Sequence, residues 1–416
     1  MNQSGIPADP DHTDVSLHDW TGLGELVDLT VDRLVTPVEG MHRAIAGRWI
    51  RLIMPRESPI PEQADRAIAG IYGTIRGAGS LLGTTIPMGA RQLAKRRRLK
   101  RLWGPGAGRA IQATANAIWG DELAHRSSAL ATSLQLRSPK GDRVPVNPIA
   151  LQQAYPEAGS DLVLLIHGWN ETEAAWSREE DSSRPHLVST IEAPDRTCLL
   201  VRYNTGLSVA ASGGALAELI DSVAASWPTA IENIHIVGHS MGGLVARNAV
   251  GRAVDLEIGW VGSLRNLVTL GTPHLGSPIE KSLALATRAL QVAPESRPIG
   301  DFLDLRSRGI KDLRYGGVVN HDWIEHKWIR PLAPDGDDGG LPESVAQHFA
   351  TGVITKDPAH PLGVIFGDLV VRPGSGTGQS RHRSVSATNL RVFGGQKHTD
   401  IIHDPEVHRQ VRAWLA

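Results

Sequence analysis

Apolar and polar positions follow two different rhythms along the chain, and the rhythm changes near residue 127. Between about residues 22 and 125, apolar residues recur at alternating spacings of four and three, which places them on one face of a helix. The first such stripe consists of Val27, Val31, Leu34, Val38, Met41 and Ile45. We expect a helical N-terminal region over 22–126, in which Pro37 kinks or splits the first helix. A polar, disordered tail over 1–21 precedes it.

From residue 127 onward, short apolar runs alternate with amphipathic stretches such as 215–227. Near-continuous apolar strands separated by helices indicate a mostly parallel sheet that helices cover on both faces. The sequence therefore predicts an α/β domain over 127–416. The predicted strands are 133–137, 162–166, 198–203, 234–237, 267–270, 350–355 and 390–393.

The stretch 279–344 interrupts the alternation of strands and helices. It contains Trp323, Trp328 and a loop over 331–341 that is rich in Pro, Gly and Asp. Ligands of parallel sheets bind beyond the carboxyl ends of the strands. We therefore expect a cap insertion over 279–344 that shapes a substrate pocket, the alternative being a packed helical excursion without substrate contact.

The stretch Gly238-His239-Ser240-Met241-Gly242 fits the pattern G-x-S-x-G. It follows the predicted strand 234–237 and precedes an amphipathic helical stretch, which is the context of a nucleophile elbow. The turn holds the serine in a strained conformation, and side chains at Gly238 or Gly242 would clash with the neighbouring strand and helix. The pattern therefore predicts Ser240 as a nucleophile.

Further segments accompany the elbow in a fixed order along the chain. The segment His167-Gly168-Trp169 precedes it, 270–277 (LGTPHLGS) follows it, and segments carrying Asp and His close the chain. Together they resemble the α/β-hydrolase superfamily over about residues 127–416. More narrowly, they resemble the bacterial lipase/esterase branch related to the catalytic domain of the GPI inositol-deacylases. The resemblance implies an α/β-hydrolase fold and acyl chemistry at a serine.

A serine hydroxyl is a weak nucleophile and needs an adjacent base. In this superfamily the acid follows Ser240 in the chain and the histidine follows the acid. Asp368 lies in a Gly-Asp-x-Val-Val stretch that resembles the acid loop of lipases, and His398 follows the last predicted strand. Asp357 is the alternative acid, although its loop lacks that pattern. His403 is the alternative base, although it falls at the start of the following helix.

Acyl transfer also needs hydrogen-bond donors for the oxyanion that develops on the carbonyl oxygen. The elbow supplies the backbone N–H of Met241. The resemblance of His167-Gly168-Trp169 to the H-G-x loop of lipases implies that the backbone N–H of Trp169 is the second donor. His167 and Gly168 are then expected to line the site.

The remaining histidines near the predicted site are expected to be structural. We expect His239 to lie inside the elbow and point away from the partner of the serine. His235 is expected in the core, and His274 beneath the site. The seventeen histidines are scattered without a ligand pattern, so no metal and no cofactor is expected.

Positive charge is concentrated in the N-terminal region. Residues 43–109 hold fourteen Lys or Arg and three acidic residues, a net charge of +11, whereas the whole chain has a net charge of −1. Half of these cations fall between Arg91 and Arg101. Such a run attracts anionic surfaces, so 43–109 is expected to contact an anionic membrane peripherally, the alternative being a solvated helix face. No nucleic-acid partner is expected, and no oligomeric state is predicted.

Composition adds two expectations about location. Cys198 is the single cysteine, which excludes a disulfide within the chain. The first nineteen residues contain no apolar core of a signal peptide, so a cytoplasmic location is expected. The stretch 69–90 has the length of a membrane span, but its Gly and Thr content favours a surface-lying or packed helix.

The sequence supports three functions. The first is a serine carboxylic-ester hydrolase that forms an acyl-enzyme, acting on lipid-like esters. The second is an acyltransferase or thioesterase with the same three catalytic residues. The third is a protein that coats a lipid or granule surface through its N-terminal region.

Overall fold

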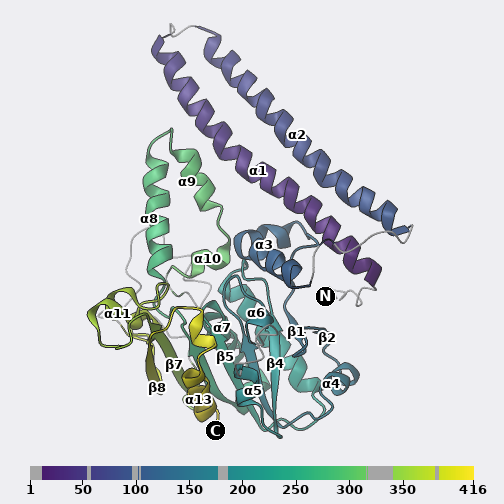
Figure 1. The fold of residues 1–416 in the computed structure, drawn as a ribbon, viewed down its shortest axis with the longest axis vertical. Helices are drawn as coiled ribbons and strands as arrows, with labels where there is room; N and C mark the ends of the chain where they lie inside the picture. The colour runs from purple at the N-terminus through teal and green to yellow at the C-terminus, as the bar shows by residue number, and fades with distance from the viewer. Residues whose placement is uncertain are drawn as a thin grey trace. The chain divides into compact units, whose positions relative to one another are not determined.

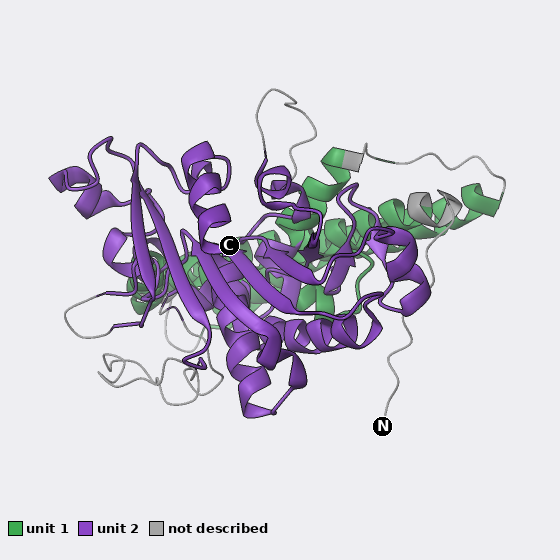
Figure 2. Ribbon diagram, turned by 90° about the horizontal axis from the view of Figure 1, so that it is seen from below, with its two compact units in different colours: residues 1–115, 122–131, 282–306 green, residues 116–121, 132–281, 307–416 purple. Residues whose placement is uncertain are grey.

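The computed structural model describes residues 12–53, 58–95, 102, 105–176, 186–314, 316, 341–379 and 384–416. They divide into two compact units, shown in green and purple in Figure 2. Unit 1 comprises residues 1–115, 122–131 and 282–306, and unit 2 comprises the rest.

Unit 2 is built around one eight-stranded sheet with the order β2-β1-β4-β3-β5-β6-β7-β8. The six strands from β3 to β8 run parallel, whereas β1 and β2 pair antiparallel at one edge. All six residues of β3 are buried, as expected of a strand covered on both faces. The strands are β1 (Gln135–Arg137), β2 (Arg143–Val144), β3 (Asp161–Ile166), β4 (Arg196–Arg202), β5 (Asn233–His239), β6 (Leu264–Leu270), β7 (Ala346–Val353) and β8 (Asn389–Gly394).

Helices cover both faces of this sheet and enclose two apolar cores. Helices α6 (Val209–Ser226) and α7 (Met241–Asp255) contribute to the core on one face. Helices α5 (Leu187–Ile191) and α13 (Pro405–Trp414) contribute to the core on the other (Figure 1). The shorter elements are α4 (Pro148–Ala154), α10 (Arg308–Asp312), α11 (Pro361–Phe366), α12 (Pro373–Gly376), η1 (Glu173–Ala175), η2 (Gly259–Ser263) and η4 (Asp400–Ile402).

A row of hydrogen-bonded polar side chains crosses the sheet near the amino-terminal ends of its parallel strands. Each of six adjacent strands contributes one residue, and the donor–acceptor distances lie between 2.6 and 3.1 Å. We call this row the polar ladder. From β8 to β4 its members are Asn389, His348, Asn266, His235, Asp161 and Arg196.

Unit 1 is helical. Its two longest helices, α1 (His12–Ile53) and α2 (Ile60–Lys95), lie side by side (Figure 1). Arg76 of α2 pairs with Glu39 of α1, and a methyl group at Gly79 would lie 2.6 Å from a methyl carbon of Val31. Pro37 lies within α1 without splitting it. Helix α1 begins at His12, so residues 12–21 are helical and do not belong to the disordered tail expected over 1–21.

Three further helices include parts of the chain assigned to unit 1. They are α3 (Pro105–His125), α8 (Pro278–Val292) and α9 (Arg297–Asp304). Residues 282–306, from the expected cap insertion, thus fall in the same compact unit as residues 1–115. Trp323, Trp328 and residues 331–340 lie outside the described residues.

The observed architecture confirms the predicted fold class. A mostly parallel sheet carries helices on both faces, and the chain order of its elements is that of an α/β-hydrolase fold preceded by a helical region. Among the described helices, none has both the length and the hydropathy needed to cross a bilayer.

Candidate active site

Ser240 occupies a sharp turn between the last residue of β5 and the first residue of α7. Its φ of 50° lies in the left-handed region, which costs a residue with a side chain about 1–3 kcal/mol. Two contacts hold the strained turn. The Ser240 N–H donates to the Leu270 carbonyl at 2.8 Å, and the Thr272 hydroxyl donates to the Ser240 carbonyl at 3.0 Å.

The glycines of the elbow allow the backbone to approach its neighbours closely. A methyl group at Gly238 would lie 2.6 Å from Cα of Gly243, and one at Gly242 would lie 2.3 Å from the Ile166 carbonyl oxygen. These distances are shorter than any side chain tolerates, so both positions require glycine.

The structure brings Ser240, His398 and Asp368 together across 158 residues of sequence. The His398 Nε2 lies 2.9 Å from the Ser240 hydroxyl oxygen, and the His398 Nδ1 lies 2.7 Å from a carboxylate oxygen of Asp368. A carboxylate only accepts, so Nδ1 of neutral His398 carries the proton. Nε2 is then free to accept the proton of the serine hydroxyl.

Backbone contacts fix the Asp368 carboxylate, whose side chain is fully buried. One carboxylate oxygen accepts from the N–H groups of Val370 and Val371 at 2.9 and 2.7 Å, which leaves the other for His398. The His398 N–H donates to the Asp368 carbonyl at 3.1 Å, so the two loops are also joined through their backbones.

Asp357 and His403, the alternative acid and base, make other contacts than Ser240, His398 and Asp368. Asp357 is exposed and accepts from the N–H of Ala359. His403 ends the 3-10 helix η4, where its N–H donates to the Asp400 carbonyl.

The loop that follows β3 lies against the elbow. A methyl group at Gly168 would lie 3.1 Å from Cβ of Ser240. The Trp169 indole N–H donates to the Ala117 carbonyl at 3.2 Å, which fixes the side chain of the residue whose backbone N–H is the predicted donor. Met241 is the first residue of α7, where backbone N–H groups have no partner within the helix. The roles of the two N–H groups in binding an oxyanion remain predictions.

His167 is buried in the same loop. Its Nδ1 donates to the Gly168 carbonyl at 2.9 Å, its Nε2 accepts from the Tyr203 N–H at 3.4 Å, and its ring stacks on the Tyr203 ring. Burial lowers the pKa of His167, consistent with a neutral ring.

The sequence predicted that His239 points away from the partner of the serine. This prediction is wrong, because His239 lies against His398. Its ring centroid lies 5.1 Å from that of His398, and its Nε2 lies 3.2 Å from the His398 carbonyl oxygen. Its Nδ1 contacts Glu171, a residue that sequence reasoning missed. Glu171 lies in a loop without periodicity, and only the folded chain places it 2.9 Å from a residue 68 positions away.

His235 and His274 are buried, as predicted. His235 is a member of the polar ladder. His274 contacts the Thr269 hydroxyl at 3.0 Å and stacks on the Phe349 ring.

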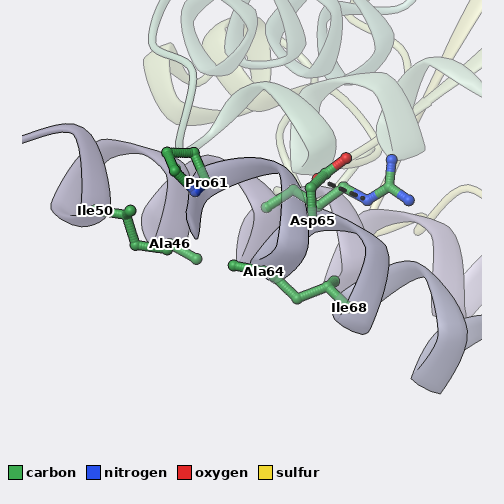
Figure 3. A pocket seen from close by; sticks show the side chains of 8 residues that line it. Ala46, Ile50, Pro61, Ala64, Asp65 and Ile68 are labelled. Atoms are coloured by element: carbon green, nitrogen blue, oxygen red, sulfur yellow. Dashed lines mark ion pairs between the residues drawn. The ribbon is translucent and has the colours of Figure 1, made fainter. Parts of the chain in front are cut away.

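A small cavity of about 100 Å³ lies in unit 1, lined by α1 and α2 (Figure 3). The Arg43–Asp65 ion pair of 3.5 Å borders it. Ligand pockets usually measure about 300–1,000 Å³, so this cavity is too small for an acyl chain. Within the described part of the chain, no three His, Cys, Asp or Glu residues are grouped as metal ligands.

One protein family matches part of the chain. Residues 157–299 match the protein family described as "Putative serine esterase (DUF676)". That range includes the Ser240 elbow and the loop after β3 but ends before Asp368 and His398. A search of curated protein sequences found no match.

Several solved structures are distantly similar. The mature lipase BlEst2 of Bacillus licheniformis is 18% identical, with a TM-score of 0.41 and coverage of 62% of this chain and 92% of the lipase. The Staphylococcus hyicus lipase is 12% identical, with a TM-score of 0.37 and coverage of 62% and 94%. The RedJ thioesterase of Streptomyces coelicolor is 12% identical, with a TM-score of 0.34 and coverage of 62% and 91%. Likeness at this level says nothing about substrate or mechanism.

Proposed function

We propose that the chain is a serine carboxylic-ester hydrolase. The observation that carries the proposal is the continuous hydrogen-bonded path from the Ser240 hydroxyl through His398 to the buried Asp368. The path lies at the carboxyl ends of parallel strands, where α/β proteins bind their ligands.

In the proposed reaction, the Ser240 Oγ attacks the ester carbonyl carbon while the His398 Nε2 takes the hydroxyl proton. The negative charge that develops on the carbonyl oxygen is stabilised by the backbone N–H groups of Met241 and Trp169. Collapse of the tetrahedral intermediate breaks the bond to the alkoxy oxygen, which receives the proton from His398 and leaves as the alcohol. His398 then takes a proton from water, whose oxygen attacks the carbonyl carbon of the acyl-enzyme. The bond to the Ser240 Oγ breaks as His398 gives that proton to it, and the acid leaves.

Lipid-like esters are the proposed substrate class. The support is the ordered set of motifs that resembles the lipase/esterase branch related to GPI inositol-deacylases. Apolar side chains are also exposed on unit 1, described below.

The proposal is tested by labelling with a fluorophosphonate, followed by mapping of the adduct and an ester panel of varied acyl length. We expect the adduct on Ser240, and a fall in kcat of about 10⁶-fold in Ser240→Ala without loss of the unfolding transition. The control Ser222→Ala changes an exposed serine of α6 and should retain full turnover. Ester hydrolysis that persists in Ser240→Ala would contradict the assignment. Transfer of the acyl group to an added alcohol in preference to water would identify an acyltransferase, and preference for thioesters a thioesterase.

We further propose that unit 1 contacts an anionic membrane surface. Between residues 67 and 89 of α2, Arg76 is the one charged residue, and it pairs with Glu39. Five large apolar side chains on this stretch are 43–64% exposed: Ile71, Ile75, Leu81, Leu82 and Met88. The cationic run 91–101 follows directly in the sequence. An apolar helix face beside clustered cations is the composition of helices that lie on anionic bilayers.

A further inference from the structure

Glu171 and His239 form a pair behind the three residues of the proposed triad, in which His239 is buried and Glu171 is partly buried. One carboxylate oxygen of Glu171 accepts two hydrogen bonds, from the Gly168 N–H at 2.7 Å and from the His239 Nδ1 at 2.9 Å. The His239 Nε2 faces the backbone carbonyl oxygen of His398 at 3.2 Å. The pair therefore joins the loop after β3 to the loop that carries the proposed base.

The contacts of His239 determine its protonation state. Both ring nitrogens face oxygen atoms that only accept hydrogen bonds, so both contacts are satisfied only when each nitrogen carries a proton. His239 is then a cation beside an anionic Glu171. His167, which precedes Glu171 in the loop after β3, differs because one of its nitrogens accepts from an N–H group. The two histidines thus differ in charge because their partners differ.

Electrostatics agree with this geometry. Burial disfavours the charged form of His239, but the charge and hydrogen bond of Glu171 outweigh it and raise the pKa of His239. Burial likewise opposes ionisation of Glu171, yet His239 and the Gly168 N–H lower the pKa of Glu171 to about 2. The other ionisable groups facing the pair are His398 and Asp368 on the side of His239, and His167 and Tyr203 on the side of Glu171.

We propose that the Glu171–His239 ion pair positions the His398 loop and the Gly168 loop relative to Ser240, and so sets the catalytic rate. This proposal rests on the proposed function. A cation alone, 5.1 Å from His398, would oppose the positive charge that His398 acquires during the reaction. The carboxylate of Glu171 neutralises that cation, so the pair holds both loops without this penalty.

The pair has a defined pH dependence. His239 is charged below its raised pKa and loses the second proton as the pH rises through it. One of its two contacts is then lost, and the two loops are held less firmly. The contribution of the pair to the rate is therefore full below the raised pKa of His239 and declines as the pH rises through it.

The decisive variant is Glu171→Gln, which keeps the size of the side chain but removes the charge that keeps His239 protonated. We expect kcat to fall roughly 10- to 100-fold with little change in KM, because misplacing reacting groups slows the chemical step. The ratio of wild-type to variant kcat should shrink as the pH rises through the raised pKa of His239, where the wild type also loses the charge. His239→Gln should show a similar loss, and the double variant no further loss.

Asp161→Asn is the matched control, since it removes a carboxylate from another buried imidazole contact at the opposite end of β3. It should lower the free energy of unfolding without a pH-dependent change in the kcat ratio. A kcat loss in Glu171→Gln that is constant across pH, or a variant with wild-type kcat, would overturn the positioning role.

A second measurement does not need catalysis. Nitrogen-15 NMR of histidine-labelled wild-type protein should show the His239 signals, assigned by their loss in His239→Gln. Both ring nitrogens should stay protonated at pH values above the ordinary histidine pKa of about 6.5. In Glu171→Gln, one of the two ring nitrogens of His239 should lose its proton under the same conditions. A singly protonated His239 in the wild type would overturn the ion pair, whereas absence of ester turnover with an intact pair would overturn the proposed function instead.

Discussion

At the scale of residues, the hydrogen-bond partner of each side chain decides its chemical state. Asp368 accepts from two backbone N–H groups and from His398, so its carboxylate fixes the proton of His398 on Nδ1. The sequence identified Ser240 from a local pattern, because the strand, the glycine-flanked turn and the helix are consecutive in the chain. It missed Glu171, because nothing local distinguishes that carboxylate from an exposed one.

The proton position on His398 gives a direct prediction for Asp368→Asn. The amide oxygen keeps the contacts to the backbone N–H groups, so the amide nitrogen faces His398 Nδ1 and donates to it. The proton of His398 then sits on Nε2, which no longer accepts from Ser240. We expect kcat to fall about 10⁴-fold in ester hydrolysis assays. Asp357→Asn, which alters the exposed alternative acid, should keep wild-type kcat, and a large loss there would contradict the assignment of the acid.

At the scale of elements, the rhythm of apolar positions predicted the parallel strands because the central ones, such as β3 and β5, are buried on both faces. Strand β2 was missed, since its two residues are too few to show a pattern. The sequence also predicted the helices of unit 1, but Pro37 does not divide α1. A proline removes one hydrogen bond and clashes with the preceding turn, and the packing of α1 along α2 offsets that cost.

The exposed face of α2 leads to a prediction about lipid binding by the full chain. We expect the protein to co-sediment with vesicles containing anionic lipid at low salt, and much less with neutral vesicles. Replacing Leu81 and Leu82 with Glu should weaken binding at least about tenfold, because burying one such side chain contributes about 1.5–3 kcal/mol.

Ile149→Glu is the matched control, since Ile149 is an exposed apolar residue on α4 of unit 2. This variant should bind vesicles like the wild type. Equal binding to neutral and anionic vesicles, or no binding at all, would contradict the proposed contact with an anionic surface.

At the scale of the whole molecule, the fold class followed from the sequence but the long-range contacts did not. The parallel sheet brings residues 158 positions apart into hydrogen-bond distance, and the chain order of the motifs anticipated that one case. The polar ladder was not anticipated, because each strand contributes one member and the partners of that member lie on other strands. The hydrogen-bond partners of such a residue can be identified only when the register of the neighbouring strands is known.

His348 in the ladder makes the stability of the molecule sensitive to acid. Burial lowers the pKa of His348 to about 4, below the ordinary value of about 6.5. Between these values the unfolded chain binds a proton that the folded chain does not, so the free energy of unfolding falls as the pH falls. Denaturant unfolding from pH 7 to pH 4 should show a shallower fall in His348→Asn. His125→Asn, at an exposed histidine, should retain the wild-type slope.

The ladder also has a polarity. The Asp161 carboxylate only accepts, so neutral His235 donates through Nε2 and accepts the Asn266 amide at Nδ1. The Asn266 carbonyl then takes the proton of His348 Nε2, and His348 Nδ1 accepts the Asn389 amide. From β8 to β5 every donor thus points toward β3, whereas Arg196 of β4 donates to the same carboxylate from the other side. One buried anion thereby orients polar side chains on strands that it never touches.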